Sequence, residues 1–336
     1  MKPDSHRSTA WYHQRLAPPT GPVRVVIDTD AANEIDDQFA LAWAMRRPDR
    51  LDVAGLYATP FSFAHRRPIL PLAPPDDPAF APPAVGMARS FDEIHRVLDV
   101  LADPVSVSAK ARVFRGSEGY LAGPEQPLRS AAVDHLIATA REHKPDGPPL
   151  YVMALGCVTN IASALMLAPD LVDRIVMVWT SGYPSHAPWP NTSLNLEQDL
   201  WASQWLFECG VPLVYLPGYH VGAQLRLSLP EMQRHVQGRG AIGDDLHRLY
   251  THNPLWSILG QTGAEPYSWV IWDIICVAWL LNPDWVPSGL VDTPRLGGDL
   301  RWAADATRPP MREAYAVHRD AIFAAFFAQA LGDGGS

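Results

Sequence analysis

Lysine, cysteine and long apolar runs are all scarce in this chain of 336 residues. Lysine occurs only at positions 2, 110 and 144, and the formal net charge is −9. Because phosphate binding needs a basic surface, we expect no nucleic-acid partner. No apolar run approaches the ~18 residues of a membrane span, so we expect no membrane partner either.

The three cysteines, Cys157, Cys209 and Cys276, are far apart and form no CxxC pair. We therefore expect reduced thiols in a reducing compartment. The first residues, MKPDSHRSTAWYHQ, contain no apolar core. We expect no secretory signal and a cytoplasmic location.

Short β-branched runs alternate with helical patterns along much of the chain. Residues 23–27 and 51–57 predict strands, and residues 35–45 between them predict a helix. Further strands are expected at 150–155, 174–179 and 212–216, and further helices at 91–101, 128–143, 159–167, 199–209 and 232–249. This β-α-β order predicts an α/β fold, a single domain with a mainly parallel central sheet flanked by helices.

The ends of the chain and one long internal segment differ from this pattern. Residues 1–21 are predicted to form a flexible arm, residues 22–330 the α/β domain, and residues 331–336 a disordered tail. Residues 60–86 are rich in proline and show neither the helical nor the strand spacing of apolar residues. Loops of this length are uncommon in compact domains and often act as lids, which we expect here.

Five acidic residues lie within ten positions in the segment DTDAANEIDD, residues 28–37. The segment follows the first predicted strand, at the sheet edge where ligands bind in open α/β folds. Carboxylates this crowded repel one another unless a cation lies among them. Oxygen ligands favour Ca²⁺ or Mg²⁺, and the turn would let Asp30 and Asp37 converge on one ion. The alternative is a solvated acidic start of a helix.

A further acid, Asp273, lies in the apolar run WVIWDIICVAWLL, residues 269–281. An ionised carboxylate in such surroundings needs a partner, which a buried metal would supply. An N-cap or an ion pair with arginine would satisfy it equally well.

Several segments, taken in chain order, resemble the inosine-uridine-preferring nucleoside hydrolase family. The DTD and DD pairs resemble the opening motif of that family. Later counterparts are VFRGS at 113–117, LGCVTNIASAL at 155–165, SLNLEQD at 193–199 and WDIICVA at 272–278. The blocks span residues 23–285, and the resemblance implies a Rossmann-like topology.

The resemblance implies an enzyme that hydrolyses the N-glycosidic bond of a ribonucleoside or modified nucleoside, giving free base and ribose. One bound Ca²⁺ would be held by Asp30, Asp37 and Asp273 and by the backbone carbonyl of Leu155. Asp30 would also be the catalytic base. The family also implies a homodimer or homotetramer.

The same resemblance assigns the contacts to ribose. Asp36 and Asn195 would bind ribose hydroxyls. Asp28 would support the acidic cluster from behind.

Three departures from the family pattern concern the substrate. Five residues separate Asp30 from Asp36 where the family has three, which adds Asn33 and Glu34 as candidate contacts to ribose or metal. Ser193 replaces a glutamate that contacts the ribose 5′-hydroxyl, which leaves room for a larger 5′ group or loses the contact. Trp272 replaces a histidine that would protonate the leaving base.

Other residues are candidates for the lost functions. His220 and His252 are candidate replacement acids. The aromatic platforms for a base are Trp189, Trp256, Trp269 and Trp272.

Two other functions stay open on the sequence. The first is a metal-dependent relative that binds a nucleoside or sugar without cleaving it, which the missing histidine and glutamate favour. The second is a phosphohydrolase with an Asp-x-Asp motif, which the scarcity of lysine disfavours.

Overall fold

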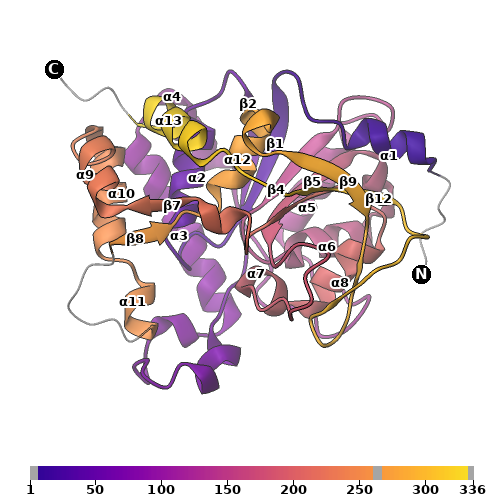
Figure 1. The fold of residues 1–336 in the computed structure, drawn as a ribbon, viewed down its shortest axis with the longest axis horizontal. Helices are drawn as coiled ribbons and strands as arrows, with labels where there is room; N and C mark the ends of the chain where they lie inside the picture. The colour runs from indigo at the N-terminus through magenta and orange to yellow at the C-terminus, as the bar shows by residue number, and fades with distance from the viewer. Residues whose placement is uncertain (1–6, 260–266, 332–336) are drawn as a thin grey trace.

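The computed structural model describes residues 7–259 and 267–331. An eight-stranded sheet has the order β3-β2-β1-β4-β5-β6-β12-β9 and forms the centre of the molecule (Figure 1). Neighbouring strands from β3 to β12 are parallel, and the edge strand β9 is antiparallel to β12. The strands are β1 Val23–Thr29, β2 Leu51–Ala58, β3 Val113–Arg115, β4 Leu150–Ala154, β5 Ile175–Ser181, β6 Leu213–Pro217, β9 Ser288–Asp292 and β12 Pro310–Ala314. The predicted α/β fold with a mainly parallel sheet is confirmed.

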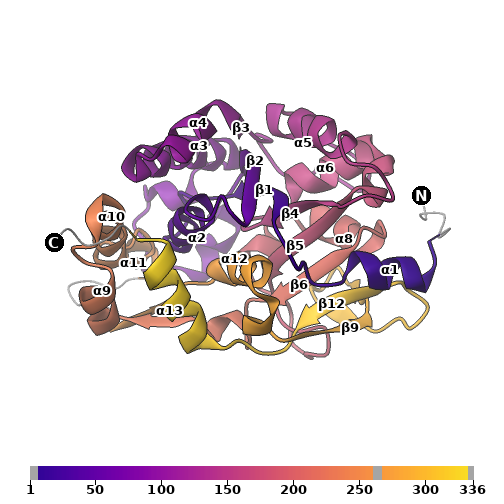
Figure 2. The same ribbon diagram turned by 90° about the horizontal axis from the view of Figure 1, so that it is seen from above.

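Helices cover both faces of this sheet, as Figure 2 shows. One face packs against α2 Asp36–Met45, α3 Pro83–Leu101, α12 Ile274–Leu281 and α13 Arg319–Gln329. The other packs against α5 Ala131–Arg141, α6 Thr159–Leu167 and α8 Leu200–Glu208. Along β1, Val25 and Ile27 join the first core and Val26 the second, as the two-residue period of a strand requires.

Shorter elements surround this framework. The remaining helices are α1 Thr9–Arg15, α4 Pro104–Ala109, α7 Leu194–Glu197, α9 Leu229–His235, α10 Gly240–Thr251 and α11 Leu255–Ile258. The 3₁₀ turns are Ala64–Ile69, Pro78–Phe80, Lys110–Arg112, Pro169–Asp173, Gly222–Gln224 and Pro283–Trp285. Two small antiparallel sheets pair β7 Arg226–Ser228 with β8 Ser268–Val270, and β10 Arg295–Leu296 with β11 Trp302–Ala303.

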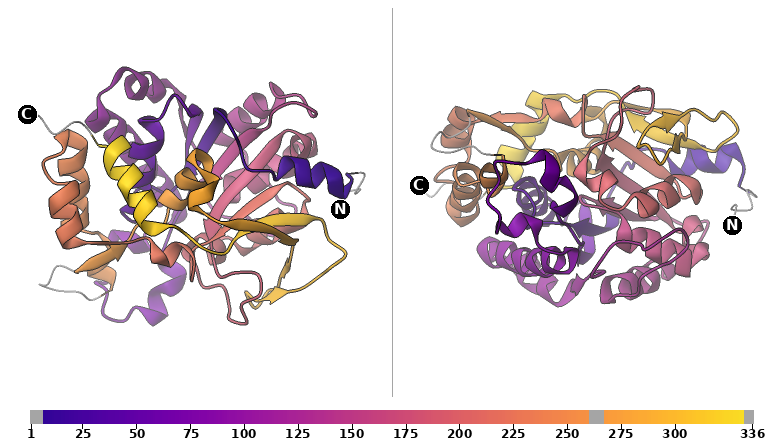
Figure 3. Two further views of the ribbon diagram at one scale, coloured as in Figure 1. Left: turned by 45° about the horizontal axis from the view of Figure 1, so that its top comes forward. Right: turned by 90° about the horizontal axis from the view of Figure 1, so that it is seen from below.

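The proline-rich segment 60–86 is folded, although its residues show neither a helical nor a strand periodicity. It contains two 3₁₀ turns, and α3 already begins at Pro83. Phe63 and Ala73 pack in a small apolar cluster with Leu255 and Ile258 of α11. Figure 3 (right) shows the segment facing the viewer, next to the orange part of the chain. It therefore lies against α11, and its predicted role as a lid stays a prediction.

Two other expectations differ from the structure. Residues 7–21 are not a loosely held arm, because α1 packs on the domain with Tyr12 and Leu16 buried, and the Tyr12 hydroxyl donates to the Gly210 carbonyl (2.8 Å). The helix expected at 232–249 is two helices, because the chain turns at Gly238 and Gly240 with φ of 75° and 72°. The tail expected at 331–336 lies, apart from Leu331, outside the described residues.

In the part of the chain that the structure describes, no helix is long and apolar enough to cross a membrane.

Candidate active site

The site forms where the strand order of the sheet reverses. β1 and β4 are adjacent, but α2 after β1 and α6 after β4 pack on opposite faces. Their carboxyl ends therefore open a crevice, the usual ligand site of such sheets. Asp30 follows β1 and Leu155 follows β4, and the Leu155 amide donates to the Asp28 carbonyl (2.8 Å). The first strand pair thus fixes two predicted site residues side by side.

Asp36 and Asp37 form the first turn of α2, and both are buried. The residue before the helix, Ile35, has no side chain able to cap it. The helix dipole favours negative charge at this end. The Thr29 hydroxyl, from the end of β1, donates to the Asp37 carboxylate and fixes its orientation.

Asp273 reaches the same place from the other end of the chain. It lies between β8 and α12 and is 3% exposed. It occupies the N-cap position of α12, but its side chain makes no capping hydrogen bond. Among the described residues it forms no ion pair with arginine or lysine. Both ordinary explanations for this buried acid therefore fail.

Asp36, Asp37 and Asp273 each have one carboxylate oxygen within 4.8 Å of the others, a spacing that fits one metal ion. The donors are all oxygens, which suits a hard divalent cation. Asp30 was predicted as a ligand but is not in this group, whereas Asp36 was predicted to bind ribose and is in it. Asp37 and Asp273 belong both to the predicted ligands and to the close group in the structure.

Burial raises the pKa of every acid in the cluster. For Asp30 and Asp273, neighbouring carboxylates raise the pKa further. Burial also raises the pKa of Asp37 to about 7, although hydrogen bonds from Thr29 and Asp273 act against this shift. Without a cation, this cluster therefore holds protons near neutral pH. A divalent ion would replace them.

Asp30 is held by its own loop and by a close backbone approach. The Asn33 amide donates to the Asp30 carboxylate (3.2 Å). A Cβ on Gly156 would lie 2.9 Å from the Asp30 Cγ and 2.5 Å from a methyl of Thr59, so only glycine fits there. The extra residues of this loop thus fold over the site and not into solvent.

Asp28 lies behind the cluster, fully buried on β1. One carboxylate oxygen accepts from the Asn160 amide (2.8 Å), and the other has no partner in the described structure. The Asn160 carbonyl oxygen in turn accepts from the Ser117 amide (2.8 Å). Two segments of the sequence resemblance therefore meet at Asp28.

A cavity of about 330 Å³ opens above these residues. The predicted metal ligands and the residues expected to contact the ribose all line it, together with Trp272: Asp30, Asn33, Glu34, Asp36, Asp37, Leu155, Asn195 and Asp273. The Asn195 amide donates to the Leu155 carbonyl (2.6 Å), so one lone pair of that expected metal ligand is already used.

The family model of the inosine-uridine preferring nucleoside hydrolases matches residues 75–321. The chain belongs to this family. It is therefore an N-glycosyl hydrolase of the nucleoside hydrolase type. The match begins after the first acidic segment, so the site residues at 28–37 rest on the structure and on their own chemistry. No curated protein matches the sequence.

Two solved nucleoside hydrolases and one effector protein share the fold at low identity. The plant nucleoside hydrolase PpNRh1 is 17% identical with a TM-score of 0.63, covering 92% of this chain and 99% of that one. The purine-preferring ribonucleoside hydrolase from Gardnerella vaginalis is 18% identical with a TM-score of 0.65, covering 91% and 98%. The type III effector XopQ, solved with adenosine diphosphate ribose, is 13% identical with a TM-score of 0.56, covering 96% of each chain.

Aromatic side chains form another part of the wall in this nucleoside hydrolase. Trp272 meets Tyr219 edge to face at 6.0 Å between ring centroids. The Trp269 indole donates to the Glu34 carboxylate (2.5 Å), which joins β8 to the added loop residues. Trp269 and Trp272 therefore stay candidate platforms, whereas Trp189 and Trp256 do not line the cavity.

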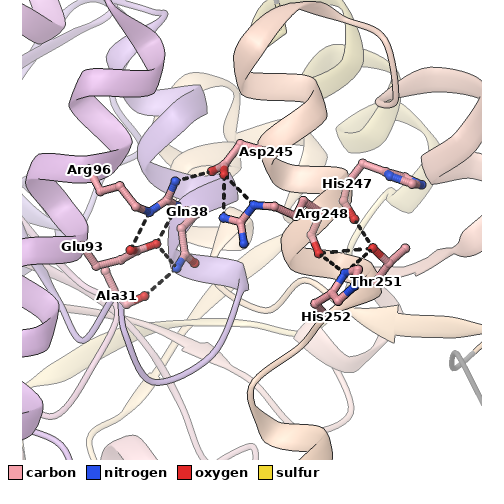
Figure 4. Close-up of polar contacts among 9 residues, drawn as sticks. All are labelled: Ala31, Gln38, Glu93, Arg96, Asp245, His247, Arg248, Thr251 and His252. Carbon is pink, nitrogen blue, oxygen red and sulfur yellow. Dashed lines mark hydrogen bonds and ion pairs between the residues drawn. The ribbon is translucent and has the colours of Figure 1, made fainter. Parts of the chain in front are cut away.

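Neither candidate replacement acid reaches the cavity. His220 packs between the Tyr183 and Trp189 rings, at 5.2 and 5.3 Å. His252 lies at the end of α10 with Nδ1 beside the Arg248 carbonyl (3.1 Å), as Figure 4 shows. No described histidine lines the cavity, so those two expectations are wrong.

A polar network outside the cavity supports the acidic loop (Figure 4). The Gln38 amide donates to the Ala31 carbonyl (2.6 Å) and to Glu93 of α3 (2.9 Å). Arg96 then bridges Glu93 and Asp245 of α10, at 2.7 and 2.8 Å. Three helices are thereby tied to the loop that follows Asp30.

Sequence reasoning missed Arg66, Ser181 and Tyr219, which also line the cavity. Arg66 lies in the proline-rich segment, where no motif singled it out. Ser181 ends β5, and only the strand order places it beside the acidic cluster.

Proposed function

We propose that the chain hydrolyses the N-glycosidic bond of a ribonucleoside or modified nucleoside, using Ca²⁺ and water, and releases free base and ribose. The observation that carries this proposal is the group of three buried carboxylates, Asp36, Asp37 and Asp273, with no cationic partner among the described residues. We propose that the nucleoside is the small-molecule partner.

The donor set fits a calcium ion, which prefers several oxygen ligands and tolerates irregular geometry. Asp37 and Asp273 would bind the ion. The geometry supports Asp36 as a further ligand, and the family resemblance supports Asp30 and the Leu155 carbonyl. Bound Ca²⁺ supplies a lowered water pKa and two-point binding of a sugar diol.

The chain's own residues supply the remaining chemistry. Asp30, held by Asn33 and packed against Gly156, would accept the proton of the attacking water. The surrounding carboxylates would stabilise the positive charge that develops on the ribose ring. Asp36 and Asn195 would position ribose hydroxyls, Asp28 would support Asp30, and Asn33 and Glu34 would contact the ribose or the ion. Trp272 would stack on the base.

A second candidate is binding without turnover. The observation that favours it is that no described histidine lines the cavity, so no histidine donates a proton to the leaving base. The solved relative XopQ contains adenosine diphosphate ribose, which fits a binding role in this fold.

One experiment separates the two candidates. Reducing-sugar release would be measured from a panel of purine and pyrimidine ribonucleosides, with Ca²⁺ and with chelator. We expect chelator-sensitive release that falls ~100-fold or more in Asp30→Asn, the range for loss of a general base. The matched control is Asp134→Asn, a half-exposed acid on α5. If a nucleoside binds but no ribonucleoside of the panel releases a reducing sugar, the second candidate is favoured.

A further inference from the structure

Arg66 is the one positively charged side chain among the described residues that line the cavity. The same cavity carries five acids, Asp30, Glu34, Asp36, Asp37 and Asp273. The acids suit a bound cation, whereas Arg66 gives the same cavity one position suited to negative charge.

The guanidinium of Arg66 is held from behind. Its Nε donates to the Glu197 carboxylate and one terminal nitrogen to the Thr192 carbonyl. The same oxygen of Glu197, Oε1, also contacts His65 Nε2 (2.8 Å), and Glu197 does not line the cavity. The Nη1 nitrogen of Arg66 has no hydrogen-bond partner among the described residues. The side chain is therefore fixed, with donors left over.

Two hydroxyl groups line the same cavity. Ser181 and Ser193 line the cavity with their Oγ atoms 3.0 Å apart. Thr192, which Arg66 binds, directly precedes Ser193, and Ser193 is two positions before Asn195. A guanidinium together with hydroxyl donors is a combination that binds phosphate.

The geometry points to a phosphate on the 5′ carbon of the substrate ribose, bound by Arg66, Ser181 and Ser193. This inference rests on the proposed function, in which the ribose 2′- and 3′-hydroxyls face the acidic cluster. The 5′ carbon is the remaining substituted position of the sugar, and it would extend from Asn195 toward Ser193, the residue before α7. The preferred substrate is then a nucleoside 5′-monophosphate. Water attacks C1′, the C1′–N bond breaks, and the products are base and ribose 5-phosphate, with the phosphoester intact.

The test compares cleavage of inosine and inosine 5′-monophosphate, and of uridine and its 5′-monophosphate, with Ca²⁺ present. We expect kcat/KM to be ~10–100-fold higher for the monophosphates, the range for a hydrogen bond to a charged group. In Arg66→Gln this ratio should collapse toward one, and Arg66→Lys should restore part of it. Arg67→Gln is the matched control, because Arg67 contacts the Pro74 carbonyl and the Phe80 ring and does not line the cavity. Its ratio should equal that of the wild type.

Three results would overturn the inference: a wild-type ratio of one or below, an equal loss on both substrates in Arg66→Gln, or release of inorganic phosphate in place of ribose 5-phosphate. If neither substrate class is cleaved, the proposed function fails, and calorimetry still decides the inference. Ribose 5-phosphate should then bind more tightly than ribose and than inorganic phosphate, and Arg66→Gln should remove the difference. Equal binding of ribose and ribose 5-phosphate would refute it.

Discussion

Replacing Asp273 by asparagine should change stability in opposite directions with and without calcium. One carboxylate oxygen each of Asp36, Asp37 and Asp273 lies within 4.8 Å of the others. At that separation and an effective dielectric constant near 20, each ionised pair repels by about 3 kcal/mol. The pKa of Asp37, raised by burial from 3.8 to about 7, corresponds to about 4 kcal/mol of lost stability at high pH.

The sign follows from where each state ionises. The unfolded carboxyl group ionises near pH ~4 and the folded Asp37 at about 7. Metal-free protein therefore loses stability as the pH rises through this window. Asp273→Asn removes one charge and its two repulsive pairs. The stability that the variant loses between pH 5 and pH 8 should therefore be smaller by about 3 kcal/mol for each of these pairs that is ionised in the wild type at pH 8. The buried amide adds a cost that is the same at both pH values and cancels in the difference.

Denaturant unfolding at both pH values, with Ca²⁺ or chelator, measures these differences. At a calcium concentration 100-fold above Kd, wild type should gain about 2.7 kcal/mol and Asp273→Asn almost nothing. Asp134→Asn, half exposed on α5, should behave as wild type throughout. The reasoning would be refuted if wild type in chelator were equally stable at pH 5 and pH 8. It would also be refuted if calcium stabilised Asp273→Asn as much as wild type.

Three further predictions concern single side chains. Gly156→Ala would place a Cβ 2.9 Å from the Asp30 Cγ, so we expect turnover to fall ~100-fold with native circular dichroism, whereas unchanged kcat would contradict the close approach. Trp272→His should raise kcat on inosine at least ~10-fold, because the histidine can protonate the leaving base. Trp201→His, at an exposed position, is the control, and no gain in Trp272→His would contradict the view that the site lacks an acid for the base. Calcium affinity measured by calorimetry should fall more in Asp36→Asn than in Asp30→Asn, because Asp36, and not Asp30, lies close to Asp37 and Asp273. A larger fall in Asp30→Asn would favour Asp30 as the ligand, as the family resemblance implies.

Local sequence patterns predicted the elements that build the site. β1 and β4 are short apolar runs, α2 carries apolar residues at helical spacing, and α6 lies where it was expected, at Thr159–Leu167. The crowded acids after β1 then follow from chain order, because the carboxyl ends of parallel strands share one edge.

Long-range contacts were beyond local patterns. Asp273 joins Asp37 across 236 positions, and only its unexplained burial in an apolar run indicated a partner. Arg66 lies in a segment without periodicity, and its place in the cavity depends on how that segment packs on α11. The break between α9 and α10 was missed because left-handed glycines at 238 and 240 interrupt an otherwise helical pattern.

The most direct test of the central claim is a calcium titration of metal-free protein, following bound calcium and nucleoside cleavage in the same samples. The account predicts that turnover appears in proportion to bound calcium and saturates at one ion per chain. Full turnover in protein shown to be free of calcium would contradict it.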